Sequence, residues 1–332
     1  MLVGRGGEFG DIAMYDVADP VHPRLLCRIQ WTSAHLSGSS GFMYLDPRSA
    51  TQTDIALRSF SGIAESRAGE LPGWITNGAW LSNGSLGAYT VRLDPTGTCG
   101  AGATQVWTYE QGSAQLLATY CDGFGDCICR FGLPAPILAL SPDGQYLAEG
   151  WLAGKGSEAM GVYRLADRVR VATLPQDTDT AFWDRGSDRL FVVSNTSVQA
   201  WTPNTGTLSG VSGANQWSFY PNMSPDGRQV VYTAFSDAVQ GTQPRVYLYD
   251  LATAKARMLI DQPRSQVVFV TDGWVWDLEE QFCSDCPNNT QPTDKIFAMN
   301  LSTGAEQSVT FAAGEALSSS YALLPGEFWP SS

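Results

Sequence analysis

Two hairpins with the same turn decide the fold of this chain. Residues 137–150 are ILALSPDGQYLAEG, and residues 221–235 are PNMSPDGRQVVYTAF. In each, Ser-Pro-Asp-Gly separates two strand-like segments. The proline fixes φ at the second position of the turn, and the glycines, Gly144 and Gly227, allow the positive φ that such turns need. Both segments are therefore predicted to form a tight β-hairpin.

A short strand with alternating apolar and polar residues recurs seven times along the chain. Its central apolar positions are Ile12, Ile55, Val106, Val162, Val198, Val246 and Ile296. Successive positions are separated by 43, 51, 56, 36, 48 and 50 residues, which is the period of a four-stranded propeller blade. The sequence therefore predicts an all-β fold, a seven-bladed β-propeller of four-stranded antiparallel blades.

The two ends of the chain continue this repeat. Counting from Ile296 through the C-terminus to Ile12 gives a further period of 48 residues. We therefore expect a strand around residues 317–323 to pair beside residues 1–5 and close the ring in blade 1, which leaves no long free sheet edge. The expectation is a single, whole propeller domain over residues 1–332 with these blades: blade 1, 316–324 plus 1–30; blade 2, 31–69; blade 3, 70–120; blade 4, 121–175; blade 5, 176–213; blade 6, 214–263; blade 7, 264–312.

The repeat also resembles a known family. Each Ser-Pro-Asp-Gly hairpin is followed by an apolar strand and then by GVYRLA (161–166) or VYLYDL (246–251), a pattern similar to the periplasmic WD-type propeller repeat of TolB and its relatives. The resemblance implies a propeller fold. It also implies roles such as protein docking, sugar or peptide binding, or gating beside the hydrolase domain of prolyl oligopeptidases. No Gly-x-Ser-x-Gly elbow occurs in this sequence to support the last of these.

Composition restricts the partners. Thirty-three acidic residues against twenty basic ones give a formal net charge of −13. This balance argues against nucleic acid or an anionic membrane surface as a partner, because both need a basic patch. No apolar run reaches the roughly eighteen residues of a membrane span, so direct membrane insertion is not predicted. The N-terminal segment lacks the basic and apolar regions of a signal peptide.

The long insertions are predicted to gather on one face of the propeller. Connections between blades, and those that join the second and third strands of a blade, emerge on the same face. The insertions assigned to this loop-rich face are residues 94–104, 121–136, 236–244 and 282–294, with 61–74 beside them. Long loops on one face of a rigid scaffold are where function usually resides, so we expect any ligand to bind there.

Six of the seven cysteines fall in these insertions: Cys99, Cys121, Cys127, Cys129, Cys283 and Cys286. For the first four we favour two disulfides, because crosslinks reduce the entropy that glycine-rich loops lose on ordering. A four-thiolate zinc site and free thiols stay open as alternatives, and sequence does not choose among the pairings. Cys283 and Cys286, which form a Cys-x-x-Cys pair, are predicted to close a small disulfide loop or to supply two zinc ligands. Disulfides would place the protein in an oxidising compartment, either periplasmic or extracellular.

Catalytic patterns are sparse. The chain has only two histidines, His22 and His35, which excludes HExxH and three-histidine zinc sites. His35, predicted in an inner strand, is either a catalytic residue or a hydrogen-bonded core residue. Asp177, Asp179 and Glu315 precede inner strands, where they are either solvated acids or carboxylates at the mouth of the central channel. Such carboxylates suit a divalent cation, Ca²⁺ or Mg²⁺ rather than Zn²⁺.

Aromatic and arginine side chains supply the other candidates for binding. Trp74, Arg130, Phe131, Trp217 and Arg264 are predicted near the entrances of inner strands, where they would either line a pocket for a ligand or fill gaps between blades. The sequence thus favours an extracytoplasmic binding or scaffold module with a protein, peptide or small-molecule ligand. The alternative is a metal-assisted hydrolase or lyase that acts on an ester, lactone, phosphoester or sugar acid. The ligand, the presence of enzymatic activity and the oligomeric state stay open.

Overall fold

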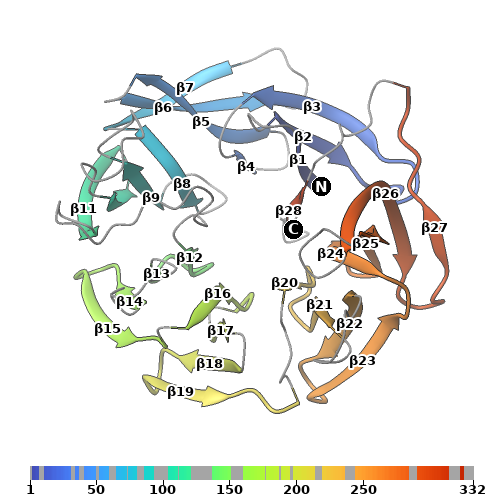
Figure 1. Ribbon diagram of the computed structural model, residues 1–332. Coiled ribbons are helices and arrows are strands. Elements are labelled where there is room, and N and C mark those ends of the chain that lie inside the picture. Colours follow the sequence, from blue (N-terminus) through green and yellow to red (C-terminus); the bar gives the residue numbers. More distant parts are fainter. Residues whose placement is uncertain are drawn as a thin grey trace. The chain divides into compact units, whose positions relative to one another are not determined.

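The repeated segments form β-strands in the computed structural model of the chain, and every regular element of the described residues is a strand (Figure 1). The structure describes residues 2–6, 11–30, 34–36, 41–49, 52–59, 65–72, 74–80, 86–92, 104–110, 112–120, 137–150, 160–175, 177–186, 188–194, 197–213, 219–235, 244–283, 290–313 and 322–324. Over this part of the chain, no helix has the length and apolar character that a membrane crossing requires.

The chain divides into two compact units, and the first comprises residues 1–30, 194–198 and 210–332. Three antiparallel sheets belong to it, with the strand orders β28-β1-β2-β3, β20-β21-β22-β23 and β24-β25-β26-β27. Their strands are β1 (Leu2–Gly6), β2 (Asp11–Asp16), β3 (Arg24–Gln30), β20 (Phe219–Met223), β21 (Gln229–Phe235), β22 (Pro244–Asp250), β23 (Lys255–Ile260), β24 (Arg264–Thr271), β25 (Trp274–Phe282), β26 (Thr290–Asn300), β27 (Glu306–Ser308) and β28 (Ala322–Leu324).

The C-terminal strand completes the N-terminal sheet, as predicted. Strand β28 pairs with β1 in antiparallel register, so that Val3 lies opposite Leu324 and Arg5 lies opposite Ala322. The other edge of β1 pairs with β2. Both ends of the chain therefore belong to one four-stranded sheet (Figure 1).

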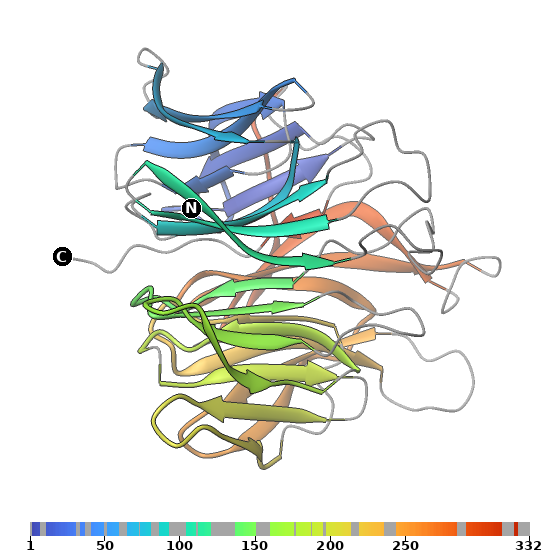
Figure 2. The ribbon, with the colours of Figure 1, turned by 90° about the vertical axis from the view of Figure 1, so that its left-hand side faces the viewer.

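The second unit comprises residues 31–193 and 199–209. Its sheets have the strand orders β4-β5-β6-β7, β8-β9-β10-β11, β12-β13-β14-β15 and β16-β17-β18-β19. In the side view of Figure 2, the green and yellow strands of the last two sheets run across the picture side by side. The strands are β4 (Ala34–Leu36), β5 (Gly41–Ser49), β6 (Gln52–Ser59), β7 (Glu65–Pro72), β8 (Trp74–Trp80), β9 (Leu86–Arg92), β10 (Thr104–Glu110), β11 (Ser113–Tyr120), β12 (Ile137–Leu140), β13 (Tyr146–Gly150), β14 (Gly161–Arg164), β15 (Val169–Thr173), β16 (Thr178–Trp183), β17 (Leu190–Ser194), β18 (Val198–Thr202) and β19 (Thr207–Gly210).

These seven four-stranded antiparallel sheets are the layout of a seven-bladed β-propeller, which confirms the predicted fold class. All seven marker residues of the sequence repeat lie in the third strand of their sheet. The six markers whose side chains the structure describes are buried, with exposed fractions of 4% or less. The limits of the blades, and the treatment of residues 1–332 as one domain, stay predictions.

Both Ser-Pro-Asp-Gly turns form the predicted hairpins, and each is closed by its own side chains. The hydroxyl of Ser224 donates to Asp226 Oδ1 at 2.6 Å and accepts the backbone N–H of Gln229 at 2.9 Å. Ser141 makes the same contacts in β12-β13, also at 2.6 and 2.9 Å. The turn glycines have φ of +71° in both hairpins, as the turn type requires.

Strand β7 corrects the expected insertion at residues 61–74. Residues 65–72 are the fourth strand of their sheet and pair with β6, with Gly69 opposite Ile55. Both Gly69 and Pro72 lie within the segment predicted as an insertion. The structure gives the glycine another reason, because a Cβ there would lie 2.9 Å from the hydroxyl of Tyr109. Residues 290–294, placed in another insertion, likewise form the start of β26.

Candidate functional site

Each sheet has two ends, and connections of different kinds leave from them. Since neighbouring strands are antiparallel, the turns that join strands one to two and three to four leave from one end, here called the hairpin end. The connection from strand two to strand three leaves from the other, here called the loop end. In β20-β23 the hairpin end carries residues 224–228 and 251–254, and the loop end carries 236–243.

Most of the residues predicted for the loop-rich face fall outside the described part of the chain. These are Cys99, Cys121, Cys127, Cys129, Arg130, Phe131, Trp217, Cys286 and Glu315. His35 and Trp74 are placed only as strand residues, in β4 and β8. Cys283, which follows β25, is disulfide-bonded, and the pairing of the other cysteines stays a prediction.

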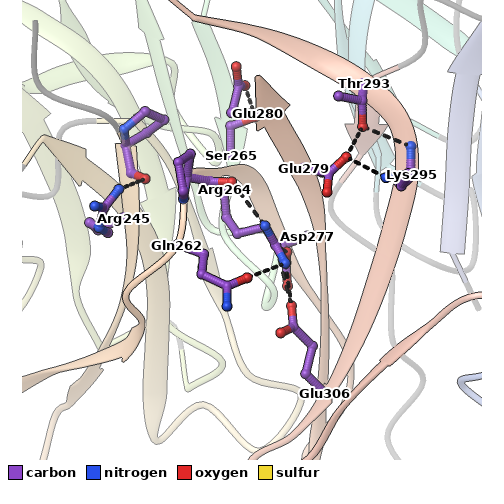
Figure 3. A network of polar contacts seen from close by, with 12 residues as sticks. Arg245, Gln262, Arg264, Ser265, Asp277, Glu279, Glu280, Thr293, Lys295 and Glu306 are labelled. Carbon is purple, nitrogen blue, oxygen red and sulfur yellow. Dashed lines mark hydrogen bonds and ion pairs between the residues drawn. The ribbon is translucent and has the colours of Figure 1, made fainter. Parts of the chain in front are cut away.

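Arg264 lies inside the sheet β24-β27 rather than on a surface, with 4% of its area exposed. Figure 3 shows its guanidinium beside the side chains of Gln262, Asp277 and Glu306. Nη2 donates to Glu306 Oε1 and to Gln262 Oε1, both at 2.9 Å, and Nη1 donates to the carbonyl of Pro263 at 3.1 Å. The guanidinium also lies 4.3 Å from the ring centre of Phe297. Each of the three guanidinium nitrogens thus has an acceptor within the protein, and its role in ligand binding stays a prediction.

Asp277, in β25, is the second carboxylate beside this arginine, and it is fully buried. Its Oδ1 lies 2.9 Å from Nε of Arg264. However, the Nε–H is directed at Glu306 Oε1, 3.3 Å away, so neither oxygen of Asp277 receives a well-aligned hydrogen bond. Burial holds the pKa of Asp277 well above its ordinary value of 3.8, the charge of Arg264 opposes this shift and the charge of Glu306 adds to it. Because Arg264 and Asp277 are both buried, this arrangement is a structural ion-pair cluster.

The predicted carboxylate pair lies at the start of β16. Asp177 is exposed and Asp179 is half-buried. Burial, and then the nearby charge of Asp177, raise the pKa of Asp179 above its ordinary value of 3.8. Two carboxylates at this spacing favour binding a cation, but among the described residues no group of three or more metal-ligating side chains comes together.

One cavity of about 320 Å³ lies at a place that the sequence did not suggest. It belongs to the second unit, and its lining comes from the sheet β8-β11 and from the turn between β14 and β15. Among the lining residues are Leu86, Thr108, Glu110, Gln115, Leu165 and Arg168. Glu110 and Ser113, at the facing ends of β10 and β11, and the turn 165–168 all lie at the hairpin ends of their sheets, away from the predicted loop-rich side.

A signal for this cavity was present in the sequence. Several hairpins that join a third to a fourth strand have a residue of positive φ at their fourth position, which is Gly206 in β18-β19, Gly304 in β26-β27 and Ala254 in β22-β23. In β14-β15 this position is Arg168, with φ of +56°. Two of the equivalent turns use glycine here, because L side chains rarely adopt positive φ. Aligning the turns, rather than the strands, would have shown Arg168 as the charged residue at this position.

The fold defines the class of this protein as a β-propeller, and solved structures agree. The tricorn protease matches 90% of this chain and 32% of its own length, at 11% identity and a TM-score of 0.58. The β-propeller domain of the Trilobed protease from Pyrococcus furiosus matches 84% of this chain and 97% of its own, at 11% identity and a TM-score of 0.51.

TolB from Acinetobacter baumannii is also among the similar structures. It matches 98% of this chain and 82% of its own, at 12% identity and a TM-score of 0.47. A scan of the sequence against models of protein families found no match, and neither did a search of curated proteins. The similarity that these comparisons establish is therefore one of fold, the propeller that the Ser-Pro-Asp-Gly hairpins predicted.

Proposed function

We propose that this protein is a β-propeller binding or scaffold module that works outside the cytoplasm and holds a protein or peptide at the loop ends of its sheets. The observation that carries the proposal is the difference between the two ends of one sheet. In β20-β23, the hairpin end consists of short turns closed by their own side chains, whereas the loop end carries residues 236–243. Insertions on a rigid scaffold are the usual carriers of recognition.

At the hairpin end of this sheet, polar groups of the turns are hydrogen-bonded within the turns themselves. Asp250 Oδ1 accepts the backbone N–H groups of Ala252 at 3.1 Å and Thr253 at 2.8 Å. These hydrogen bonds lower the pKa of Asp250 and keep it ionised. Ser224 and Asp226 close the other turn in the same way. The turns satisfy their own polar groups, which favours the opposite end as the binding end.

The location outside the cytoplasm is supported by Cys283. A disulfide at this position persists in an oxidising environment, such as the periplasm or the extracellular space, and is rare in the cytosol. A count of free thiols in denaturant, on protein isolated without reductant, tests this part of the proposal. About one free thiol is expected if the other loop cysteines pair as predicted, and seven would contradict it.

The binding role is tested by exchanging loops. Replacing residues 236–243 with Asn-Gly, a sequence that favours a two-residue hairpin, should leave the melting temperature nearly unchanged but abolish photo-crosslinks to the natural partner. The matched control replaces residues 301–304, at the hairpin end of the neighbouring sheet, and should keep the crosslinks. Loss of crosslinks in the control, with retention in the loop variant, would reverse the assignment of the two ends.

A metal-assisted hydrolase or lyase is the second candidate, and the raised pKa of Asp179 beside Asp177 is the observation that favours it. Calorimetry with Ca²⁺ and Mg²⁺ should then show one site that is lost in a variant with both residues changed to Asn. Turnover of chromogenic esters or phosphoesters should be sensitive to chelator. Unchanged cation uptake in the variant would remove these carboxylates from the proposal.

A further inference from the structure

The cavity in the second unit brings two opposite charges to one small site. Glu110 ends β10 and Arg168 ends the turn that precedes β15, and both line the cavity. Neither side chain forms an ion pair or hydrogen bond with another residue that the structure describes. Because both are exposed at the rim, the two charges are available to a molecule that enters.

Hydrogen bonds and strand pairing hold the backbone at Arg168 and Glu110 in place. Arg164 Nε donates to Asp167 Oδ1 at 3.0 Å, and the same carboxylate accepts the backbone N–H of Val169 at 3.3 Å. These bonds close the turn around Arg168 and hold it at positive φ. On the other side, Glu110 pairs with Ser113 across the tight turn that contains Gly112, whose φ is +89°.

The rest of the lining is mixed. Leu86 and Leu165 supply apolar surface, and Gln115 and Thr108 supply polar groups. The Thr108 hydroxyl donates to the backbone carbonyl of Gln115 at 3.3 Å, so it reinforces the pairing of β10 with β11. Beneath the cavity, Leu165 packs against a buried cluster that joins the two sheets, formed by Ala88, Val106 and Leu147. The walls are therefore held by core packing.

Arg168 stands at a turn position where the backbone has positive φ. The equivalent position is Gly206 or Gly304 in two other hairpins, and a Cβ added at either would meet no atom within 4 Å. Space therefore does not explain the choice of residue, and the strain of an L residue at positive φ is not avoided here. Ala254, the equivalent residue of β22-β23, carries the same strain with φ of +55°. The charge beside the cavity, rather than the strain, therefore distinguishes Arg168.

We propose that this cavity binds a small aliphatic zwitterion, a free amino acid or dipeptide. Its carboxylate would pair with Arg168, its ammonium with Glu110, and its side chain would lie on Leu86 and Leu165. The cavity volume of about 320 Å³ suits a ligand of this size, because it is near the lower limit of roughly 300 Å³ for small-molecule sites. Surface ion pairs contribute little individually, so the expected dissociation constant is about 1 mM.

The test is a titration followed by amide NMR on the intact chain with three probes: L-leucine, N-acetyl-L-leucine, which lacks the ammonium, and L-leucinamide, which lacks the carboxylate. L-Leucine should shift amides around residues 108–115 and 165–169, and each of the other two should bind about tenfold more weakly. Leucyl-leucine separates a dipeptide from a free amino acid as the better ligand. Equal affinity for the three leucine compounds, or no shifts up to about 20 mM, twenty times the expected constant, would overturn the proposal.

Variants separate binding from stability. Arg168→Gln keeps the strained backbone and Glu110→Gln keeps the shape, and each should weaken L-leucine about tenfold. Arg168→Gly should raise the melting temperature while it abolishes binding. Its matched control, Ala254→Gly, relieves the same strain in a turn outside the cavity and should raise the melting temperature with binding unchanged. If Arg168→Gly kept the affinity of the natural protein, the site assignment would be wrong.

Discussion

Arg264, the first residue of β24, is buried beside two carboxylates. The residue was a candidate for ligand binding because arginine at an inner-strand entrance suits a pocket. Its contacts with Asp277 and Glu306, both from the same sheet, instead make it part of the interior. A buried pair of this kind contributes less than its geometry suggests, since desolvation offsets the attraction, but removing one partner is costly.

Replacing Arg264 by methionine should therefore lower the free energy of unfolding by about 3 kcal/mol, because two carboxylates would be left together in the interior without a cation. The matched control is Arg245→Met. Arg245 also donates Nη1 to the carbonyl of the preceding proline, at 3.3 Å, but its ion partner Asp261 is exposed. That change should cost about 1 kcal/mol or less. Urea denaturation measures both, and equal losses would contradict the difference in burial.

The raised pKa of Asp277 makes the stability of the fold depend on pH. A carboxyl whose pKa is higher in the folded state binds its proton more tightly there, so its contribution is fully present below the ordinary value of 3.8 and is lost as pH rises through the folded pKa. Asp277→Asn removes this dependence. The variant should gain stability relative to the natural protein as the pH rises above the ordinary pKa of 3.8, as followed by thermal unfolding. Parallel pH profiles for the two proteins would count against the shift.

Among the elements, β7 shows why glycine alone is an ambiguous sequence signal. Gly69 was interpreted as part of a loop, yet it sits in a strand because the Tyr109 hydroxyl approaches its Cα closely. Nothing in the local sequence distinguishes that reason from a turn, since the tyrosine comes from the next sheet. The Ser-Pro-Asp-Gly hairpins are the opposite case, because all their stabilising hydrogen bonds come from residues within the same turn.

Gly69→Ala should accordingly destabilise the protein by about 1 to 3 kcal/mol, the usual cost of overpacking a closed interior. Gly210→Ala is the control, because a Cβ there meets no atom within 4 Å and its φ is not in the positive region. That change should be neutral or slightly stabilising. Denaturation midpoints of the two variants provide the comparison, and a neutral Gly69→Ala would mean that Tyr109 moves aside freely.

At the scale of the whole molecule, the sheet formed by both chain ends is the decisive feature. Strand β1 lies between β28 and β2, so the N-terminal segment depends on the C-terminal one for the pairing of one of its two edges. The period of the repeat predicted this pairing. Sequence reasoning did not find the cavity, however, because its lining residues come from two sheets and none of them has an unusual local pattern apart from Arg168.

Deleting residues 317–332 should therefore destabilise the protein far more than trimming a tail would. The deletion removes β28 and leaves the edge of β1 without backbone partners, which is costly and promotes association between chains. Deleting residues 325–332 keeps β28 and is the matched control. Chemical denaturation with size-exclusion chromatography should show a large loss of stability and aggregation only for the longer deletion. Similar behaviour of the two truncated chains would show that β28 contributes little.

The sequence by itself determined the number of sheets, the order of their strands and the turns that join them, because these depend on repeat spacing and on hydrogen bonds between residues close in the chain. Tertiary structure alone decided that Arg264 is an interior ion-pair residue, that Gly69 belongs to a strand, and that Glu110 and Arg168 share a cavity. The physical reason is the same in all three cases. Burial, close approach and the pairing of charges depend on residues from other strands. The distances to those residues cannot be predicted from a local stretch of sequence.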